Sequence, residues 1–154
     1  NSEAWRPHMR SRARLRTSPV RYFVDPSLGP AALNIGSAAL IADPRALGFH
    51  FEALVMRDLR IYAQRLRGVV DSWRDSNGNE VDAIITTRDG WGAFEIKLNP
   101  AAVDDAADAL RRFAANVDTA VQGDPTVLGV ITSTGYAGRR EDGVYVIPIS
   151  TLGP

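Results

Sequence analysis

Two acidic residues and one lysine, Asp82, Glu95 and Lys97, have the types and spacing to form a hydrolytic site. Carboxylates are ligands that Mg²⁺ accepts in proteins, usually one or two of them with water completing the octahedron. An ion held in this way can activate a water molecule and neutralise a phosphodiester in the transition state. A nearby ammonium can hold the attacking water or stabilise the developing negative charge. The three residues therefore indicate metal-assisted phosphodiester hydrolysis, with Mg²⁺ or Mn²⁺ as the ion.

A β-hairpin is expected to bring these residues together. Residues 80–87 are rich in β-branched side chains, Asp89-Gly90 is a strong turn signal, and residues 91–98 form the return strand. With Asp89-Gly90 as a two-residue loop, each pair of opposite residues follows from the spacing. Because side chains alternate between the two faces of a strand, the positions on each face also follow.

In this register Asp82 lies opposite Lys97 and Ile84 lies opposite Glu95. Glu95 is then the diagonal neighbour of Asp82, about 5–8 Å away at Cβ. All three candidate residues point to one face of the hairpin. The other face is an apolar surface for a helix, made by Val81, Ala83, Ile85, Phe94, Ile96 and Leu98.

Lys97 is the single lysine among 18 basic residues, the others being arginine. Arginine does not replace lysine where a compact ammonium is needed, although one lysine must lie somewhere and chance explains its place equally simply. Glu52 is a fourth candidate, in the first turn of a predicted helix. A helix packed near the hairpin would bring its carboxylate to the metal; the equal alternative is a favourable charge at a helix N-terminus.

The remaining elements follow from periodicity, capping and turn signals. We expect a short strand at 21–26, helical turns at 28–34 and 36–42, a helix at 48–67, strands at 68–73, 80–87, 91–98, 126–132 and 143–150, and a helix capped by Asn99, with Pro100 at its first position and an apolar stripe to Val121. A helix separates the strands expected at 91–98 and 126–132. This order predicts that the two strands pair in parallel through a right-handed crossover. The expected fold is α/β, a mixed sheet flanked by helices.

Composition limits the function classes. Residues 22–154 are enough for one domain, preceded by a basic arm over 1–21 that is either held against a surface or a solvated lead-in. The chain has no cysteine, which excludes disulfides and thiolate metal sites. Its two histidines, His8 and His50, are too few to favour a histidine-rich zinc site. We find no membrane-spanning run and expect a cytoplasmic protein. The formal net charge is zero, so contact with nucleic acid requires a local patch.

The pattern of Asp82, Glu95 and Lys97 resembles the PD-(D/E)xK nuclease superfamily, and the α-β-β-β-α-β order resembles its restriction-endonuclease-like core. The resemblance implies that Asp82, Glu95, Lys97 and Glu52 are the catalytic residues, Glu52 being the acid often supplied by the first core helix. It also implies Asp82, Glu95 and Glu52 as metal ligands. The chain departs from the superfamily name in having Val81, not proline, before the aspartate.

A closer resemblance is to the uncharacterised C-terminal domain of bacterial and archaeal AAA+-type ATPases, over roughly residues 20–150. It is carried by YFVDPSL (22–28), GFHFE (48–52), WRD (73–75), NGNEVD (77–82) and FEIK (94–97). In that family an ATPase module precedes the domain, whereas this chain has no G-x-x-x-x-G-K-[ST] loop and no ATP site of that kind is expected.

Two functions from different classes remain open at this stage. The first is a Mg²⁺-dependent, nuclease-like domain acting on DNA, in which the arm and the arginines of the first long helix meet phosphates. The second is a catalytically inactive regulatory or protein-interaction module that docks on its ATPase or on a second copy of itself.

Overall fold

The computed structural model describes residues 4–6, 8–10, 21–22, 25–32 and 34–153. Its elements are α1 (Leu28–Ala32), α2 (Ser37–Ala42), α3 (Pro44–Arg65), β1 (Val69–Arg74), β2 (Glu80–Thr87), β3 (Gly90–Lys97), a 3-10 turn (Pro100–Ala102), α4 (Val103–Asn116), α5 (Thr119–Gln122), β4 (Val127–Thr132), β5 (Gly138–Arg139), β6 (Tyr145–Pro148) and a second 3-10 turn (Ile149–Thr151). The predicted order of one long helix, three strands, a helix and further strands is confirmed.

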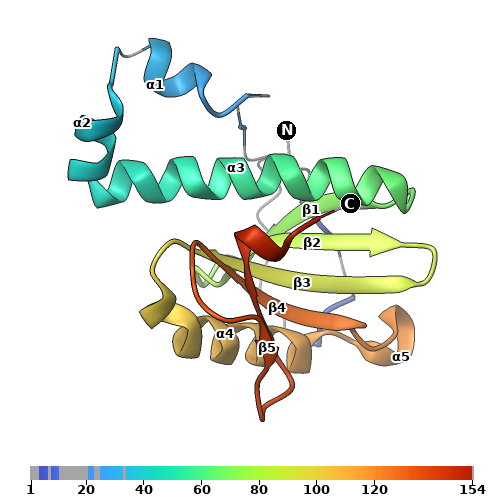
Figure 1. The fold of residues 1–154 in the computed structure, drawn as a ribbon. Coiled ribbons are helices and arrows are strands. Elements are labelled where there is room, and N and C mark those ends of the chain that lie inside the picture. The colour runs from blue at the N-terminus through green and yellow to red at the C-terminus, as the bar shows by residue number, and fades with distance from the viewer. Residues whose placement is uncertain (1–3, 7, 11–20, 23–24, 33, 154) are drawn as a thin grey trace.

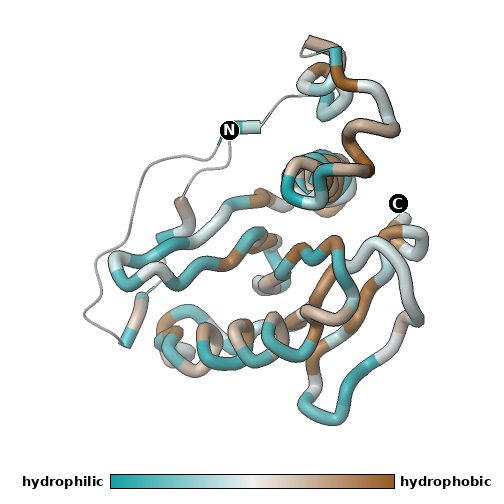
Figure 2. The backbone as a smooth tube through the Cα atoms, turned by 90° about the vertical axis from the view of Figure 1, so that its left-hand side faces the viewer, coloured by the Kyte–Doolittle hydropathy of each residue, from teal (hydrophilic) through white to brown (hydrophobic). Residues whose placement is uncertain are grey.

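The strands form one six-stranded mixed sheet in the order β1-β2-β3-β4-β6-β5. The first three strands pair antiparallel, whereas β3 pairs parallel with β4, as the crossover through α4 predicted. Helix α3 covers one face of the sheet and α4 covers the other (Figures 1 and 2). The protein is therefore a three-layer α/β/α domain.

Aromatic residues fill the layer between the sheet and α4. Trp91 from β3 lies 4.9 Å from Trp5 and 6.1 Å from Phe113 of α4, measured between ring centroids. The Trp73 ring centroid lies 4.8 Å from that of the same Phe113 ring, with the two planes tilted by 53°. Trp5 belongs to the predicted arm, and its backbone N–H donates to Ser72 O of β1 at 2.8 Å. This described part of the arm is therefore docked on the domain, where its indole ring is buried.

Helix α3 begins at Pro44, four residues before the predicted start at Gly48. The physical reason is a cap that the apolar periodicity did not show. The Asp43 side chain accepts hydrogen bonds from the backbone N–H groups of Arg45 and Ala46, and Pro44 occupies the first turn, where its missing N–H costs nothing. The earlier start extends α3 past the sheet toward α2 (Figure 1).

Two other predicted boundaries were wrong. Helix α4 ends at Asn116 because Val117 is extended and Asp118 caps the separate short helix α5; the apolar stripe to Val121 therefore spans two helices. The strand predicted over 21–26 is not formed at Arg21, Tyr22, Asp25 or Pro26, and residues 23–24 lie outside the described residues.

Among the described helices, we find none that combines the length and the apolar character needed to cross a bilayer.

Candidate functional site

The β2–β3 hairpin has a different register from the predicted one. Thr87 pairs with Gly90, so the loop is Arg88-Asp89, and Ile84 lies opposite Ala93 instead of Glu95. Gly90 is a strand residue with φ 139°, and a Cβ there would lie 2.8 Å from Thr126 Cγ2. Glycine is needed at position 90 because the strand approaches Thr126 so closely. This tertiary contact outweighs the preference of Gly90 for the hairpin loop.

A bulge in β2 lies directly before the site. Between β1 and β2 the register shifts after Asp71–Ile84, so that Trp73 pairs with Val81. As a result Val81 and Ile84 both belong to the core cluster on the α4 side, and the prediction that Val81 shares a face with Ala83 was wrong. Bulges re-aim side chains and end strand pairing, and this one sits where β2 and β3 separate.

Asp82 lies at that separation and uses its carboxylate in place of a strand partner. Regular β2–β3 pairing ends at Ala83–Phe94. Two residues beyond Phe94, the Ile96 N–H donates to Asp82 Oδ2 at 2.8 Å. The aspartate therefore holds the two strands together at their diverging ends.

Asp82, Glu95 and Lys97 meet at this end of the hairpin, and we call them the β2–β3 cluster. Lys97 Nζ lies 2.5 Å from Glu95 Oε2 and 3.4 Å from Asp82 Oδ2. The exposed fraction of the side chain is 5% for Glu95, 13% for Asp82 and 32% for Lys97. The proximity expected from the sequence is thus present, although it arises from another register and a bulge.

The buried position of the cluster disfavours the charged forms of both Glu95 and Lys97. Burial raises the pKa of Glu95, and the neighbouring Asp82 carboxylate raises it further, while Lys97 acts in the opposite direction. Burial works to lower the pKa of Lys97, but Asp82 and Glu95 outweigh it and the pKa is raised. A buried carboxyl with a raised pKa beside an ammonium is an arrangement enriched at functional sites.

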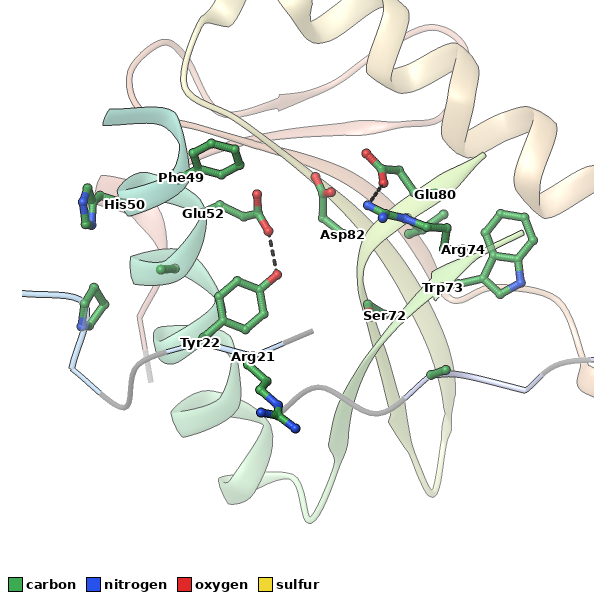
Figure 3. Close-up of a pocket in the computed structure, with 14 residues that line it drawn as sticks. Arg21, Tyr22, Phe49, His50, Glu52, Ser72, Trp73, Arg74, Glu80 and Asp82 are labelled. Carbon is green, nitrogen blue, oxygen red and sulfur yellow. Dashed lines mark hydrogen bonds and ion pairs between the residues drawn. The ribbon is translucent and has the colours of Figure 1, made fainter. Parts of the chain in front are cut away.

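Glu52 approaches the cluster from α3, on the opposite side of the β2 chain. Its Oε1 accepts a hydrogen bond of 2.6 Å from the Tyr22 hydroxyl, and its side chain points toward Asp82 (Figure 3). Burial raises the pKa of Glu52, the Tyr22 hydrogen bond lowers it, and the Asp82 carboxylate raises it again. The interpretation of Glu52 as only a helix N-terminal charge does not fit, because α3 begins eight residues earlier.

Tyr22 is a member of the site that sequence reasoning missed. It precedes α1 in the chain, and no spacing or periodicity connects it with a helix residue 30 positions away. The ring also receives the Arg60 guanidinium, 5.2 Å from its centroid. Only the packing of this segment against α3 shows that Tyr22 orients Glu52.

Two hollows meet at the cluster. One, of about 680 Å³, lies between α3 and the β1–β2 edge and contains Glu52 and Asp82. The other, of about 500 Å³, lies on the α4 side and contains Glu95 and Lys97. Trp73 and Glu80 line both. Within the described ranges, no group of three or more acidic or histidine side chains is close enough to hold one metal ion.

The sequence matches the family described as "Domain of unknown function (DUF4143)" over residues 47–152, about two thirds of the chain. The chain belongs to this family. The DUF4143 region includes Glu52 and the β2–β3 cluster, whereas Tyr22 lies before it. This agrees with the expected kinship to an uncharacterised domain. No curated protein and no solved structure matched the chain.

Removing the Tyr22 hydroxyl from this DUF4143 domain by Tyr22→Phe should lower the free energy of unfolding by about 1–2 kcal/mol, because Glu52 loses a charge-assisted partner in a half-buried place. Urea unfolding at pH 7 measures the loss. Tyr136→Phe is the matched control, since Tyr136 is 96% exposed and should show no change. Equal stability of both variants would mean that the Tyr22–Glu52 contact does not hold the segment.

Proposed function

We propose that this chain is a Mg²⁺- or Mn²⁺-dependent, nuclease-like domain acting on DNA in the cytoplasm, with a restriction-endonuclease-like core. The observation that carries the proposal is the β2–β3 cluster itself. Two carboxylates lie within 3.4 Å of the ammonium of the chain's single lysine, at the point where two strands separate. A bulge in the β1–β2 pairing lies at the same point, and a solvated charged face has no need of one.

The donor set fits a hard divalent cation. Asp82 and Glu95 supply two carboxylates, the number that Mg²⁺ commonly takes from a protein while keeping its waters. Their shared burial is unfavourable without a cation, and the ammonium of Lys97 now partly meets that need. When bound, the ion would supply Lewis-acid stabilisation of the phosphodiester and a more acidic water.

The roles of the other residues follow from their positions. Lys97, in contact with both carboxylates, would hold the attacking water or the developing negative charge on phosphate. Glu52, held in orientation by the Tyr22 hydroxyl, would act as an auxiliary acid through a metal-bound water, because it is not close enough to Asp82 and Glu95 to share one ion directly. Arginines on α3, among them Arg60 and Arg65, with Arg57 paired to Asp58, would provide local positive charge in a chain of zero net charge.

A regulatory or protein-interaction module is the second candidate, and an observation favours it. Several large apolar side chains on or beside α1, α2 and α3 are exposed, among them Leu28 (51%), Ile41 (69%) and Ile61 (51%). Large apolar side chains left exposed at a surface can mark protein contacts. The partner would be the ATPase module implied by the sequence resemblance, or a second copy of the domain.

Calorimetric titration with Mg²⁺ and Mn²⁺ tests the proposal. We expect binding by the wild-type domain and at least a tenfold loss of affinity in Asp82→Asn and in Glu95→Gln, because each removes one of two charged ligands. Asp108→Asn is the control, since this α4 carboxylate is 58% exposed and should not affect binding.

Cleavage of DNA by the loaded domain, lost in Lys97→Met, would extend the result from metal binding to activity. If the folded wild-type domain binds neither ion at millimolar concentration, the nuclease proposal fails and the interaction module takes its place.

A further inference from the structure

The hollow on the α3 side is larger than metal binding requires. Its volume of about 680 Å³ is in the range of pockets that hold whole small molecules. Aromatic side chains, Tyr22, Phe49 and Trp73, contribute to its lining, and Arg21 and Arg74 lie along it (Figure 3). It ends at Asp82, so whatever fills it touches the proposed metal site.

One stripe of α3 brings the Phe49 ring to the wall of this hollow, with Ala53 beside it in the lining and Arg45 one turn earlier, outside the lining. Arg45, Phe49 and Ala53 follow at intervals of four residues and therefore lie one above the other on the helix. The Arg45 guanidinium lies 5.9 Å from the centroid of the Phe49 ring. The Phe49 side chain is nevertheless 61% exposed and points toward the sheet side (Figure 3).

The same pairing of ring and guanidinium occurs at Tyr22, whose ring lies 5.2 Å from the Arg60 guanidinium carbon. Aromatic rings with neighbouring arginines are the means by which proteins hold single-stranded nucleic acid, through base stacking and contact with phosphates. A large exposed phenylalanine at the mouth of a pocket has no evident structural task.

We propose that this hollow receives an unpaired base of a single-stranded DNA segment, stacked against Phe49, with the adjoining phosphate directed to Asp82. The inference rests on the proposed nuclease-like function and names its substrate class. A base within a duplex is covered on both faces by its neighbours and cannot enter a concave pocket without being extruded. A single strand meets no such barrier.

The distribution of charge supports this orientation. Glu52 is near enough to Asp82, a member of the β2–β3 cluster, for their charges to interact, and a cation bound there would offset both. Glu80 is paired with Arg74, which reduces its repulsion of phosphate. Arg21 lines the hollow, and Arg45 and Arg60 lie outside the lining against the Phe49 and Tyr22 rings, where the backbone of a stacked strand would run.

The test compares a fluorescently labelled 12-nucleotide single strand with its duplex by anisotropy, in Ca²⁺ and again in EDTA. We expect the wild-type domain to bind the single strand at least about tenfold more tightly than the duplex. Phe49→Ala should weaken single-strand binding by roughly 5- to 100-fold, the range for the loss of one stacking ring. Phe49 is exposed, so the variant should fold.

Ile61→Ala is the matched control, since Ile61 is 51% exposed on the same helix but does not line the hollow. Equal affinity for both DNA forms, no effect of Phe49→Ala, or no binding at all would overturn the inference, the last pointing to a protein ligand. Metal binding and duplex cleavage without single-strand preference would leave the nuclease proposal standing. Single-strand binding without metal affinity would support the single-strand inference and contradict the nuclease proposal.

Discussion

Replacing Lys97 by methionine should lower the free energy of unfolding by about 2–3 kcal/mol at pH 8 in EDTA, because it leaves two carboxylates buried without their cation. Lys97 Nζ is 2.5 Å from Glu95 and 3.4 Å from Asp82, and both carboxylates are largely covered. The loss should be smaller at pH 6, where Glu95 with its raised pKa holds its proton. Chemical unfolding at the two pH values measures the difference.

The control for this variant is Arg111→Met on α4. Arg111 also pairs with a carboxylate, at 3.5 Å from Asp108, but both side chains are more than half exposed. Its loss should cost under about 0.5 kcal/mol at either pH, as for other exposed ion pairs. If the two substitutions cost the same, the β2–β3 cluster is an ordinary surface charge group and its burial has no energetic weight.

The sequence predicted the layers of the fold because these depend on local signals. The apolar stripe of α3, the alternation in β2 and β3 and the cap at Asn99 are each written in neighbouring residues. The parallel β3–β4 pair follows from the helix between the strands. Boundaries were less certain, since the cap at Asp43 and the interruption at Val117 compete with a longer apolar pattern.

The sequence predicted that Asp82, Glu95 and Lys97 lie together, but it placed them in the wrong hairpin register. A hairpin with its loop at Asp89-Gly90 gave the right grouping of Asp82, Glu95 and Lys97. The true loop, Arg88-Asp89, moves the pairing by two residues, which keeps the predicted faces along the paired part of the hairpin, whereas the bulge changes the face of Val81. The bulge beside Asp82 is not visible in the sequence, because it reflects how β2 fits β1 on one side and β3 on the other.

Tyr22 and the hollow beside it could not be predicted for a different reason. Both depend on contacts between segments far apart in the chain, the region before α1, the middle of α3 and the start of β2. Loop-like segments carry no periodic signal that would place them on a particular face. The sequence could give Glu52 only as a candidate, because its proximity to Asp82 depends on how α3 packs on the sheet.

Glu95→Gln should stabilise the metal-free domain at alkaline pH, although it removes a proposed ligand. The pKa of Glu95 is raised from 4.5 to about 8 by burial and by Asp82, against the effect of Lys97. The folded state therefore holds this proton more strongly than the unfolded state does. The stability that this provides is fully present below pH 4.5 and is lost as the pH rises through about 8.

Glutamine resembles the protonated carboxyl and does not titrate. The variant should therefore match the wild type near pH 4.5 and exceed it by about 1–3 kcal/mol at pH 9. Other charged groups that line the α4-side hollow, Asp75, Asp105 and Arg112, are unchanged in both proteins and do not enter the difference. Thermal unfolding in EDTA across this pH range is the measurement. A difference that stays constant with pH would show that Glu95 is ionised in the folded protein throughout, and that Lys97 alone suffices to hold both carboxylates charged.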